Sequence, residues 1–309
     1  MVGATGMIRA ANDRVANVQR IEGLEDVLVA VDGPAVNYLL IGSDSREGSD
    51  PNAPDFGGIG DTGDVQGRRS DTIMILRQER NGEGAAILSI PRDLLVTISD
   101  TGNQDRVNSA YNRGADVLAA TITQELGIPI NHVIDIDFFG FKELVDAVGG
   151  TTLCFEYATR DANTGFVQDP GCHHLDGVQA LAYARSRNYE EFRDGDWRKD
   201  PTADLGRIVR QQAFIAAAAD TTLRRLKADP FLASELLDAI SATVRLDPAL
   251  DPVGAAGTLR KAFSTGLFTY QLDVRGEDFN GKSILRINDS SAPILDYFRG
   301  IGPLPPAGG

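Results

Sequence analysis

The chain has 309 residues, of which 42% are hydrophobic and 24% are charged, and its formal net charge at pH 7 is -14. This composition is typical of a folded globular protein with a sizeable core and excludes a mostly disordered chain. The acidic balance argues against a general nucleic-acid binder, because affinity for a phosphate backbone comes from clustered Lys and Arg. No stretch approaches the roughly 18 apolar residues that cross a bilayer, and no signal-peptide pattern is present.

The N-terminal half of the chain predicts strands that stop in polar loops. A lead-in over residues 1–36 contains an apolar strand at 26–31 and precedes a buried strand at 37–46. A loop rich in Gly, Asp, Pro and Ser spans 47–69. The next elements are strands at 71–80 and 84–93 joined at Asn81-Gly82, a helix at about 114–126, a strand at 132–138, and a helix at about 138–148 that Asp137 caps.

The C-terminal half is mainly helical by its hydrophobic periodicity. A polar, charged segment at 188–201 holds the only Trp, Trp197. The expected helices lie at 175–185, 202–227, 231–244, 252–264 and 291–299, and the expected strands at 268–274 and 283–287. Interleaved strands and helices with at least one hairpin favour an α/β protein with a mixed sheet flanked by helices.

The two cysteines, Cys154 and Cys172, enclose a polar, turn-rich segment. A disulfide closing this loop would stabilise the protein by about 3 kcal/mol in the chain-entropy estimate. It would also indicate an oxidising, extracytoplasmic compartment. The alternative is a pair of unrelated buried thiols.

Four polar clusters lie where apolar strands or helices stop, and a fifth opens the predicted helix at 202–227; ligand sites of α/β proteins gather beyond strand ends. They are GSDSR (42–46), RRSD (68–71), PRD (91–93), ARSR (184–187) and GRIVRQQ (206–212). Each has an ordinary structural explanation, such as a turn cap at Asp44 or a surface ion pair between Arg92 and Asp93. Arg185 and Arg187 would also be favourable at a helix C-terminus.

Together the five clusters favour a pyrophosphate–metal site. Arginine forks bind phosphate oxygens bidentately, and Mg²⁺ is held by one or two carboxylates plus phosphate oxygens. The 30 basic residues include 25 Arg and only 5 Lys. A GC-rich genome explains that bias equally well, so only the positions of the arginines support the site.

With these clusters in view, the chain resembles the LytR–CpsA–Psr family of cell-wall glycopolymer ligases. The matching segments occur in the family's order over about residues 37–220: NYLLIGSDSREG, RRSDTIMIL, LSIPRDLLVTI, RVNSAYNRG, IDIDFFGFKELVDAVGG, LDGVQALAYARSR and DLGRIVRQQAFI. The resemblance implies a three-layer α/β/α arrangement around a mixed β-sheet. It implies one catalytic domain over 37–300, followed by a flexible tail at 301–309. Residues 1–36 would then follow a membrane anchor that this chain lacks.

The resemblance also implies an activity at the extracytoplasmic face of the cell membrane. Such proteins transfer a glycopolymer from a polyprenyl-pyrophosphate carrier to peptidoglycan through a phosphodiester, with Mg²⁺ as the metal. The arginine-rich, lysine-poor usage and the two cysteines resemble the actinobacterial branch, for which the polymer would be arabinogalactan. Two alternatives remain: a polyprenyl pyrophosphate phosphohydrolase that uses water as nucleophile, and a non-catalytic binder or regulator of lipid-linked sugars.

Site residues follow from the same motifs. Asp44 and Asp71 would hold Mg²⁺. The residues expected to grip the pyrophosphate are Arg92, Arg185, Arg187, Arg207 and Gln211, with Arg46, Arg69 and Arg106 as secondary candidates. Asp93 would orient Arg92 or act as a general base. The expectation that carries the enzyme assignment is that these separate stretches converge on one diphosphate.

Overall fold

A computed structural model describes residues 18–43, 70–80, 84–229 and 232–306. These residues divide into two compact units, each described by itself. The sheet unit contains the described residues of 18–43, 70–136 and 244–306, and the helical unit contains those of 137–243. No helix in the described ranges is both long and apolar enough to span a bilayer.

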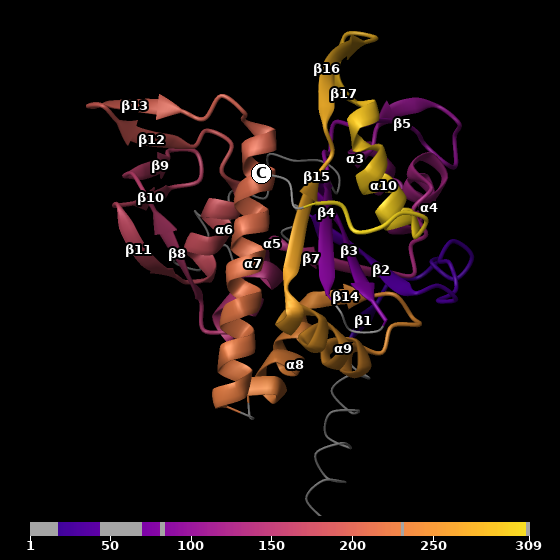
Figure 1. Cartoon of the computed structure of the whole chain (residues 1–309), viewed down its shortest axis with the longest axis horizontal. Helices are drawn as coiled ribbons and strands as arrows, with labels where there is room; N and C mark the ends of the chain where they lie inside the picture. The colour runs from indigo at the N-terminus through magenta and orange to yellow at the C-terminus, as the bar shows by residue number, and fades with distance from the viewer. Residues whose placement is uncertain (1–17, 44–69, 81–83, 230–231, 307–309) are drawn as a thin grey trace, which may run out of the picture. The chain divides into compact units, whose positions relative to one another are not determined.

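A seven-stranded mixed sheet is the centre of the sheet unit (Figure 1). Its strand order is β1 (Gln19–Arg20), β14 (Val244–Leu246), β7 (His132–Asp137), β2 (Ala35–Ser43), β3 (Ser70–Glu79), β4 (Ala85–Ile90) and β15 (Leu267–Gln271). The β2–β3 and β3–β4 pairs are antiparallel, whereas β15 pairs with β4 in parallel. The mixed α/β class predicted from the sequence is confirmed.

One face of this sheet is covered by helices of the same unit. Alternating residues such as Leu39, Ile75 and Leu88 point into a core shared with α4 (Ala115–Leu126) and α10 (Ala292–Arg299). Alternation arises because successive side chains of a strand point to opposite faces. Helix α4 ends at Gly127, whose φ of 68° is the left-handed conformation that glycine adopts without strain. The remaining elements here are β5 (Leu95–Thr97), β6 (Gln104–Arg106), α3 (Asn108–Tyr111), α9 (Pro252–Thr265), β16 (Val274–Phe279), β17 (Lys282–Ile287) and a 3₁₀ turn (Asp289–Ser291).

A buried ion pair joins three elements of the sheet unit. Asp135 of β7 is 1% exposed and accepts hydrogen bonds from the Tyr111 hydroxyl at 2.7 Å and from Arg245. Burial and then the charge of Asp135 raise the pKa of the Tyr111 phenol well above its ordinary value. The phenol therefore stays protonated and donates to the carboxylate. Tyr111 of the motif RVNSAYNRG thus has a structural role rather than a role in ligand binding.

The helical unit combines four helices with two small sheets. The helices are α5 (Phe138–Ala147), α6 (Gly177–Arg185), α7 (Asp204–Ala228) and α8 (Leu232–Thr243). The sheets are β8 (Thr151–Phe155) with β11 (Gly171–Leu175), and the set β10 (Phe166–Gln168), β9 (Thr159–Asp161), β12 (Glu190–Arg193) and β13 (Asp196–Lys199). Phe155, Phe166 and Tyr183 pack ring against ring in the core of this unit.

The predicted N-cap of α5 is correct. The Asp137 carboxylate accepts a hydrogen bond from the Gly140 N–H at 2.7 Å, which begins α5 as predicted. Helix α6 begins with a reciprocal capping box between Asp176 and Gln179. These local signals act without help from distant residues, which is why they were visible in the sequence.

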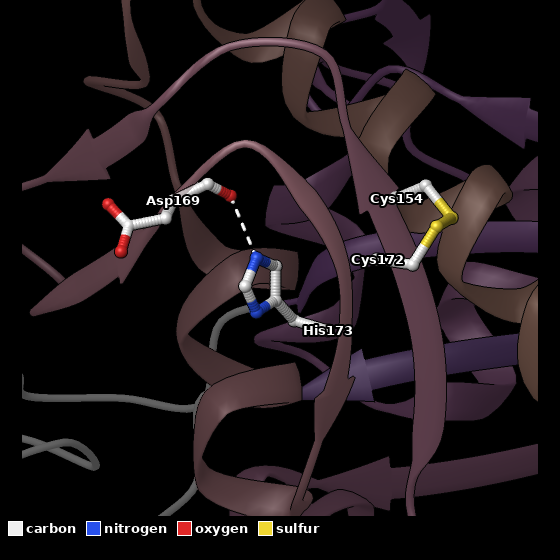
Figure 2. Close-up of a disulfide and its surroundings, with 4 residues drawn as sticks. All are labelled: Cys154, Asp169, Cys172 and His173. Carbon is white, nitrogen blue, oxygen red and sulfur yellow. Dashed lines mark hydrogen bonds between the residues drawn. A yellow bond between two sulfur atoms is a disulfide. The ribbon is translucent and has the colours of Figure 1, made fainter.

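Cys154 and Cys172 form the predicted disulfide. They face each other across the antiparallel pair β8–β11, and Figure 2 shows the bridge beside His173. The Nε2 atom of His173 donates to the backbone carbonyl of Asp169 at 2.9 Å, so this histidine closes the turn before β11. The enclosed segment is more ordered than its turn-rich sequence suggests, because it forms β9 and β10.

Three sequence-based expectations differ from the structure. Residues 26–31 form turns and irregular backbone instead of a strand. The segment 188–201 contains the hairpin β12–β13, turned at Asp194-Gly195 with φ of 54° and 86°. The missed strand β16 pairs with β17 around Asn280-Gly281, with φ of 53° and 74°. Asp-Gly and Asn-Gly are the signatures of such two-residue hairpin turns, so both hairpins were predictable.

The C-terminal segment 301–309 is predicted to be a flexible tail, and the structure describes its residues 301–306. Pro305 is buried, and its carbonyl accepts a hydrogen bond from the Tyr270 hydroxyl at 2.7 Å. The Pro/Gly composition of the segment concealed this contact, because a backbone carbonyl has no signature in the side-chain sequence.

Candidate active site

The loop between the two predicted metal-binding aspartates starts and ends at paired strand residues. Ser43 of β2 pairs with Ser70 of β3, and Gly42 pairs with Thr72 across a β-bulge. A Cβ at position 42 would lie 2.8 Å from the Thr72 Cβ, so only glycine permits this close approach. The residues that follow Ser43 and Ser70 in sequence are the two aspartates. The side chains of Asp44, Arg46, Arg69 and Asp71 lie outside the described residues.

Arg92 and Asp93 follow the end of β4 in the sheet unit. The Arg92 Nε atom lies 3.6 Å from Asp93 Oδ2, and the Arg106 guanidinium lies 3.3 Å from Asp93 Oδ1. Arg106 also donates through Nε and a terminal nitrogen to the Ser283 carbonyl, at 3.0 and 2.6 Å. Asp93 thus lies between two guanidinium groups, an arrangement that suits the expected orienting role toward Arg92. Arg106 supports the β17 strand, which is a structural task that the sequence did not reveal.

Four predicted phosphate-binding residues lie together in the helical unit. Arg185 is the last residue of α6, Arg187 comes two positions later, and Arg207 and Gln211 occupy the first turns of α7. The Gln211 amide donates to the Ala184 carbonyl at 3.1 Å and so joins the two helix ends. The structure therefore brings these four residues to one place within a single unit.

Asp204 is the carboxylate at the centre of this cluster. Its Oδ1 atom lies 3.3 Å from Arg187 Nε and 3.0 Å from a terminal nitrogen of Arg207. Sequence analysis missed Asp204, although an Asp three residues before Arg207 at a helix start is a recognisable ion-pair signal. Two guanidinium groups therefore share one carboxylate, and these three side chains together carry one net positive charge. Such a cluster attracts a multiply charged anion.

Burial divides the three arginines into different classes. The Arg207 side chain is 3% exposed, whereas that of Arg187 is 34% exposed. Arg185 is half-buried, and its guanidinium carbon lies 4.3 Å from the centre of the Phe138 ring. An arginine over a ring face is held by cation–π attraction without losing its hydrogen-bond donors. Arg185 and Arg187 are therefore the accessible cations, and Arg207 supports them from below the surface.

The expected magnesium depends on residues outside the description. Within the described parts of the chain, no group of three or more His, Cys, Asp or Glu side chains is arranged to hold a metal ion. Two carboxylates and phosphate oxygens suffice for Mg²⁺ when the substrate supplies the remaining ligands. Asp44 and Asp71 remain the predicted pair, and the Ser43–Ser70 pairing brings their chain positions to one end of the β2–β3 ladder.

Comparison with known proteins agrees with this description. The chain matches the LytR_cpsA_psr family over residues 6–295. It is 36% identical over 186 residues to the probable cell wall biosynthesis protein LcpB of Corynebacterium glutamicum, covering 60% of this chain and 41% of that protein. It is 35% identical over 197 residues to the polyisoprenyl-teichoic acid–peptidoglycan teichoic acid transferase TagU of Enterococcus faecalis, covering 62% and 59%.

The fold is shared with a solved structure, the LytR-Csp2A-Psr enzyme from Actinomyces oris. The TM-score is 0.70 at 22% identity, and the match covers 91% of this chain and 95% of that one. The chain spans about half the length of the curated relatives that it matches.

Proposed function

The chain belongs to the LytR–CpsA–Psr family, and we propose that it transfers a glycopolymer from a polyprenyl-pyrophosphate carrier to peptidoglycan. The observation that carries the proposal is the pairing of Arg187 and Arg207 with Asp204 in the helical unit, close in sequence to Arg185 at the end of α6. The printed name of the Enterococcus relative, a polyisoprenyl-teichoic acid–peptidoglycan transferase, supports the same donor and acceptor classes.

In the proposed reaction, an acceptor sugar hydroxyl attacks the donor phosphorus that carries the glycopolymer. The new P–O bond forms a phosphodiester, and the bond to the second phosphate breaks so that polyprenyl phosphate leaves. The hydroxyl proton passes to a base, for which Asp93 is the candidate. Phosphoryl transfer depends mainly on charge neutralisation and in-line positioning. Arg185 and Arg187 would hold the pyrophosphate, and Arg92 would contribute from the end of β4.

Magnesium would be held by Asp44 and Asp71 and would neutralise phosphate charge when bound. The β2–β3 register supports this assignment, because Ser43 and Ser70, which directly precede Asp44 and Asp71 in the sequence, are paired across the two strands. The donor chemistry is also suitable, since carboxylate and phosphate oxygens are the ligands that Mg²⁺ prefers. Arg46 and Arg69 remain secondary phosphate-binding candidates on the same loop.

The proposal also includes the cellular compartment and the identity of the polymer. The disulfide between Cys154 and Cys172 supports an oxidising location at the extracytoplasmic face of the membrane. The Corynebacterium relative supports the actinobacterial branch, and we propose arabinogalactan as the polymer. Donors that carry arabinogalactan and teichoic acid, compared at equal concentration, would test this choice directly.

The decisive experiment incubates labelled lipid-linked glycopolymer with peptidoglycan fragments and Mg²⁺. A polymer–phosphate–peptidoglycan adduct, identified by mass spectrometry, is the expected product. Free polymer phosphate without adduct would instead establish the phosphohydrolase. Binding of the donor with neither product would establish a non-catalytic binder.

Matched variants connect the activity to the cluster. Arg185→Ala and Arg187→Ala should each abolish adduct formation. Arg198→Ala is the control, because it removes the same charge from a 59% exposed side chain of the same unit, where Arg198 pairs only with the exposed Asp194 among the contacts described. If Arg198→Ala also loses activity, the loss in the Arg185 and Arg187 variants cannot be assigned to the arginine cluster.

A further inference from the structure

Ser186 lies between the two accessible arginines, Arg185 and Arg187. Ser186 ends α6 with φ of -60° and ψ of 123°, and it is fully buried. Its N–H donates to the Tyr183 carbonyl at 3.2 Å. Its hydroxyl donates to Asp161 Oδ2 at 2.6 Å, and its carbonyl accepts from Arg210 at 2.7 Å. Every polar group of Ser186 therefore has a partner.

Asp161 holds this turn from β9. The carboxylate is fully buried and also accepts hydrogen bonds from the backbone N–H groups of Asn188 and Asn163, both at 2.8 Å. Burial raises the pKa of Asp161, but the hydrogen bonds from Ser186 and these N–H groups outweigh it and leave the pKa below its ordinary value. Asp161 is thus a carboxylate that only accepts, and it binds the residues on both sides of Arg187.

Arg210 holds the same turn from α7. Its side chain is 7% exposed, and its second terminal nitrogen donates to Asp200 Oδ2 at 2.7 Å. The guanidinium carbon lies 4.6 Å from the centre of the Tyr189 ring. A side chain at position 206 would collide with the Asp200 carboxylate, so Gly206 is what allows this carboxylate to approach α7 and reach Arg210. A planar guanidinium fork suits two such directed bonds, whereas a lysine ammonium does not.

Hydrophobic packing would stabilise this region at least as well as buried charges do. Replacing a buried ion pair by well-packed apolar residues is often neutral or stabilising, so a buried polar network is weak evidence for stability. What the network does specify is the backbone geometry of one residue. That residue is Ser186, which lies between Arg185 and Arg187. The spacing of these two cations matters when both bind the same anion.

We infer that Asp161 and Arg210 are positioning residues that fix Ser186, so that Arg185 and Arg187 are held in the geometry that binds a lipid pyrophosphate. The inference rests on the proposed function and adds residues that do not themselves touch the donor. We predict that removing single hydrogen bonds from this network weakens pyrophosphate binding while the protein stays folded.

The test measures binding of farnesyl pyrophosphate with Mg²⁺ by isothermal titration calorimetry, on the whole chain and well below its unfolding temperature. Ser186→Ala removes one hydroxyl, and Arg210→Lys keeps the charge but loses the fork. Each should raise the Kd about tenfold, the size expected for a misplaced binding group. Thr151→Val is the control, because Thr151 is 1% exposed and its hydroxyl contacts Thr221 in the same unit.

A double-mutant cycle measures how strongly Asp161 and Ser186 are coupled in ligand binding, which a purely structural role would not change. Asp161→Asn should weaken binding less in the Ser186→Ala background than in the wild type, because the shared hydrogen bond is already lost. The inference would be overturned if Ser186→Ala and Arg210→Lys bind farnesyl pyrophosphate as tightly as Thr151→Val does. If Arg210→Lys does not fold, Ser186→Ala and the double-mutant cycle decide alone. Wild-type binding that Arg185→Ala leaves unchanged would instead overturn the proposed function.

Discussion

Removing the disulfide should destabilise the protein measurably without preventing folding. The bridge joins residues 18 positions apart, and the chain-entropy estimate for a loop of that length is about 3 kcal/mol. Both cysteines are exposed on their strands, so Cys154→Ser with Cys172→Ser exchanges no buried packing. At about 2–4 °C for each kcal/mol, the melting temperature should fall by about 6–12 °C.

The assay is thermal unfolding followed by circular dichroism, with the wild type measured both oxidised and in excess dithiothreitol. The reduced wild type and the double variant should unfold together. Thr152→Ala is the matched control, because Thr152 is exposed on the same strand and pairs with His174 without a covalent bond. Equal melting temperatures for oxidised and reduced wild type would refute the loop-closure argument. Two free thiols in the native protein, detected by mass spectrometry, would refute the bridge itself.

Three further predictions follow from burial and charge. Arg207→Ala should lower the free energy of unfolding by about 3 kcal/mol, because the Arg207 guanidinium is buried in its ion pair with Asp204. Arg185→Ala should lower it less, because Arg185 is half-buried over the Phe138 ring. Both substitutions should abolish transfer. The pKa values of Asp161 and Asp200 are lowered in the folded protein, so their stabilisation is present above the ordinary aspartate pKa of 3.8 and is lost as the pH falls through the folded values. Acid unfolding should therefore begin as the pH drops below about 4, and Asp161→Asn should flatten that dependence. Removing divalent metal with EDTA should abolish transfer, and added Mg²⁺ should restore it.

Each of these predictions has an outcome that contradicts it. Equal unfolding free energies for the Arg207 and Arg185 variants would mean that the burial difference has no energetic consequence. An unchanged acid transition in Asp161→Asn would show that this carboxylate does not contribute to stability at neutral pH. Transfer that continues at full rate in EDTA would exclude the metal from the proposed reaction.

The strands and helices with strong local signals were predictable from the sequence. Apolar runs bounded by polar loops and turns placed β2, β3 and β4 in a mixed sheet, and Asp137 marked the start of α5. The arginine clusters were also visible, because each lies at one end of a predicted strand or helix. Such features depend on residues that are neighbours in the chain, so one sequence is enough to predict them.

Only the tertiary structure decided what each charged side chain does. Arg106 supports a carbonyl 177 positions away at Ser283, whereas Arg207 is buried against Asp204. Arg210 resembles Arg207 in sequence, yet it bonds to the Ser186 carbonyl and to Asp200. Residue type determines that a guanidinium must find acceptors. Which acceptors it finds depends on long-range packing that brings distant backbone within about 3 Å, and no local pattern records that.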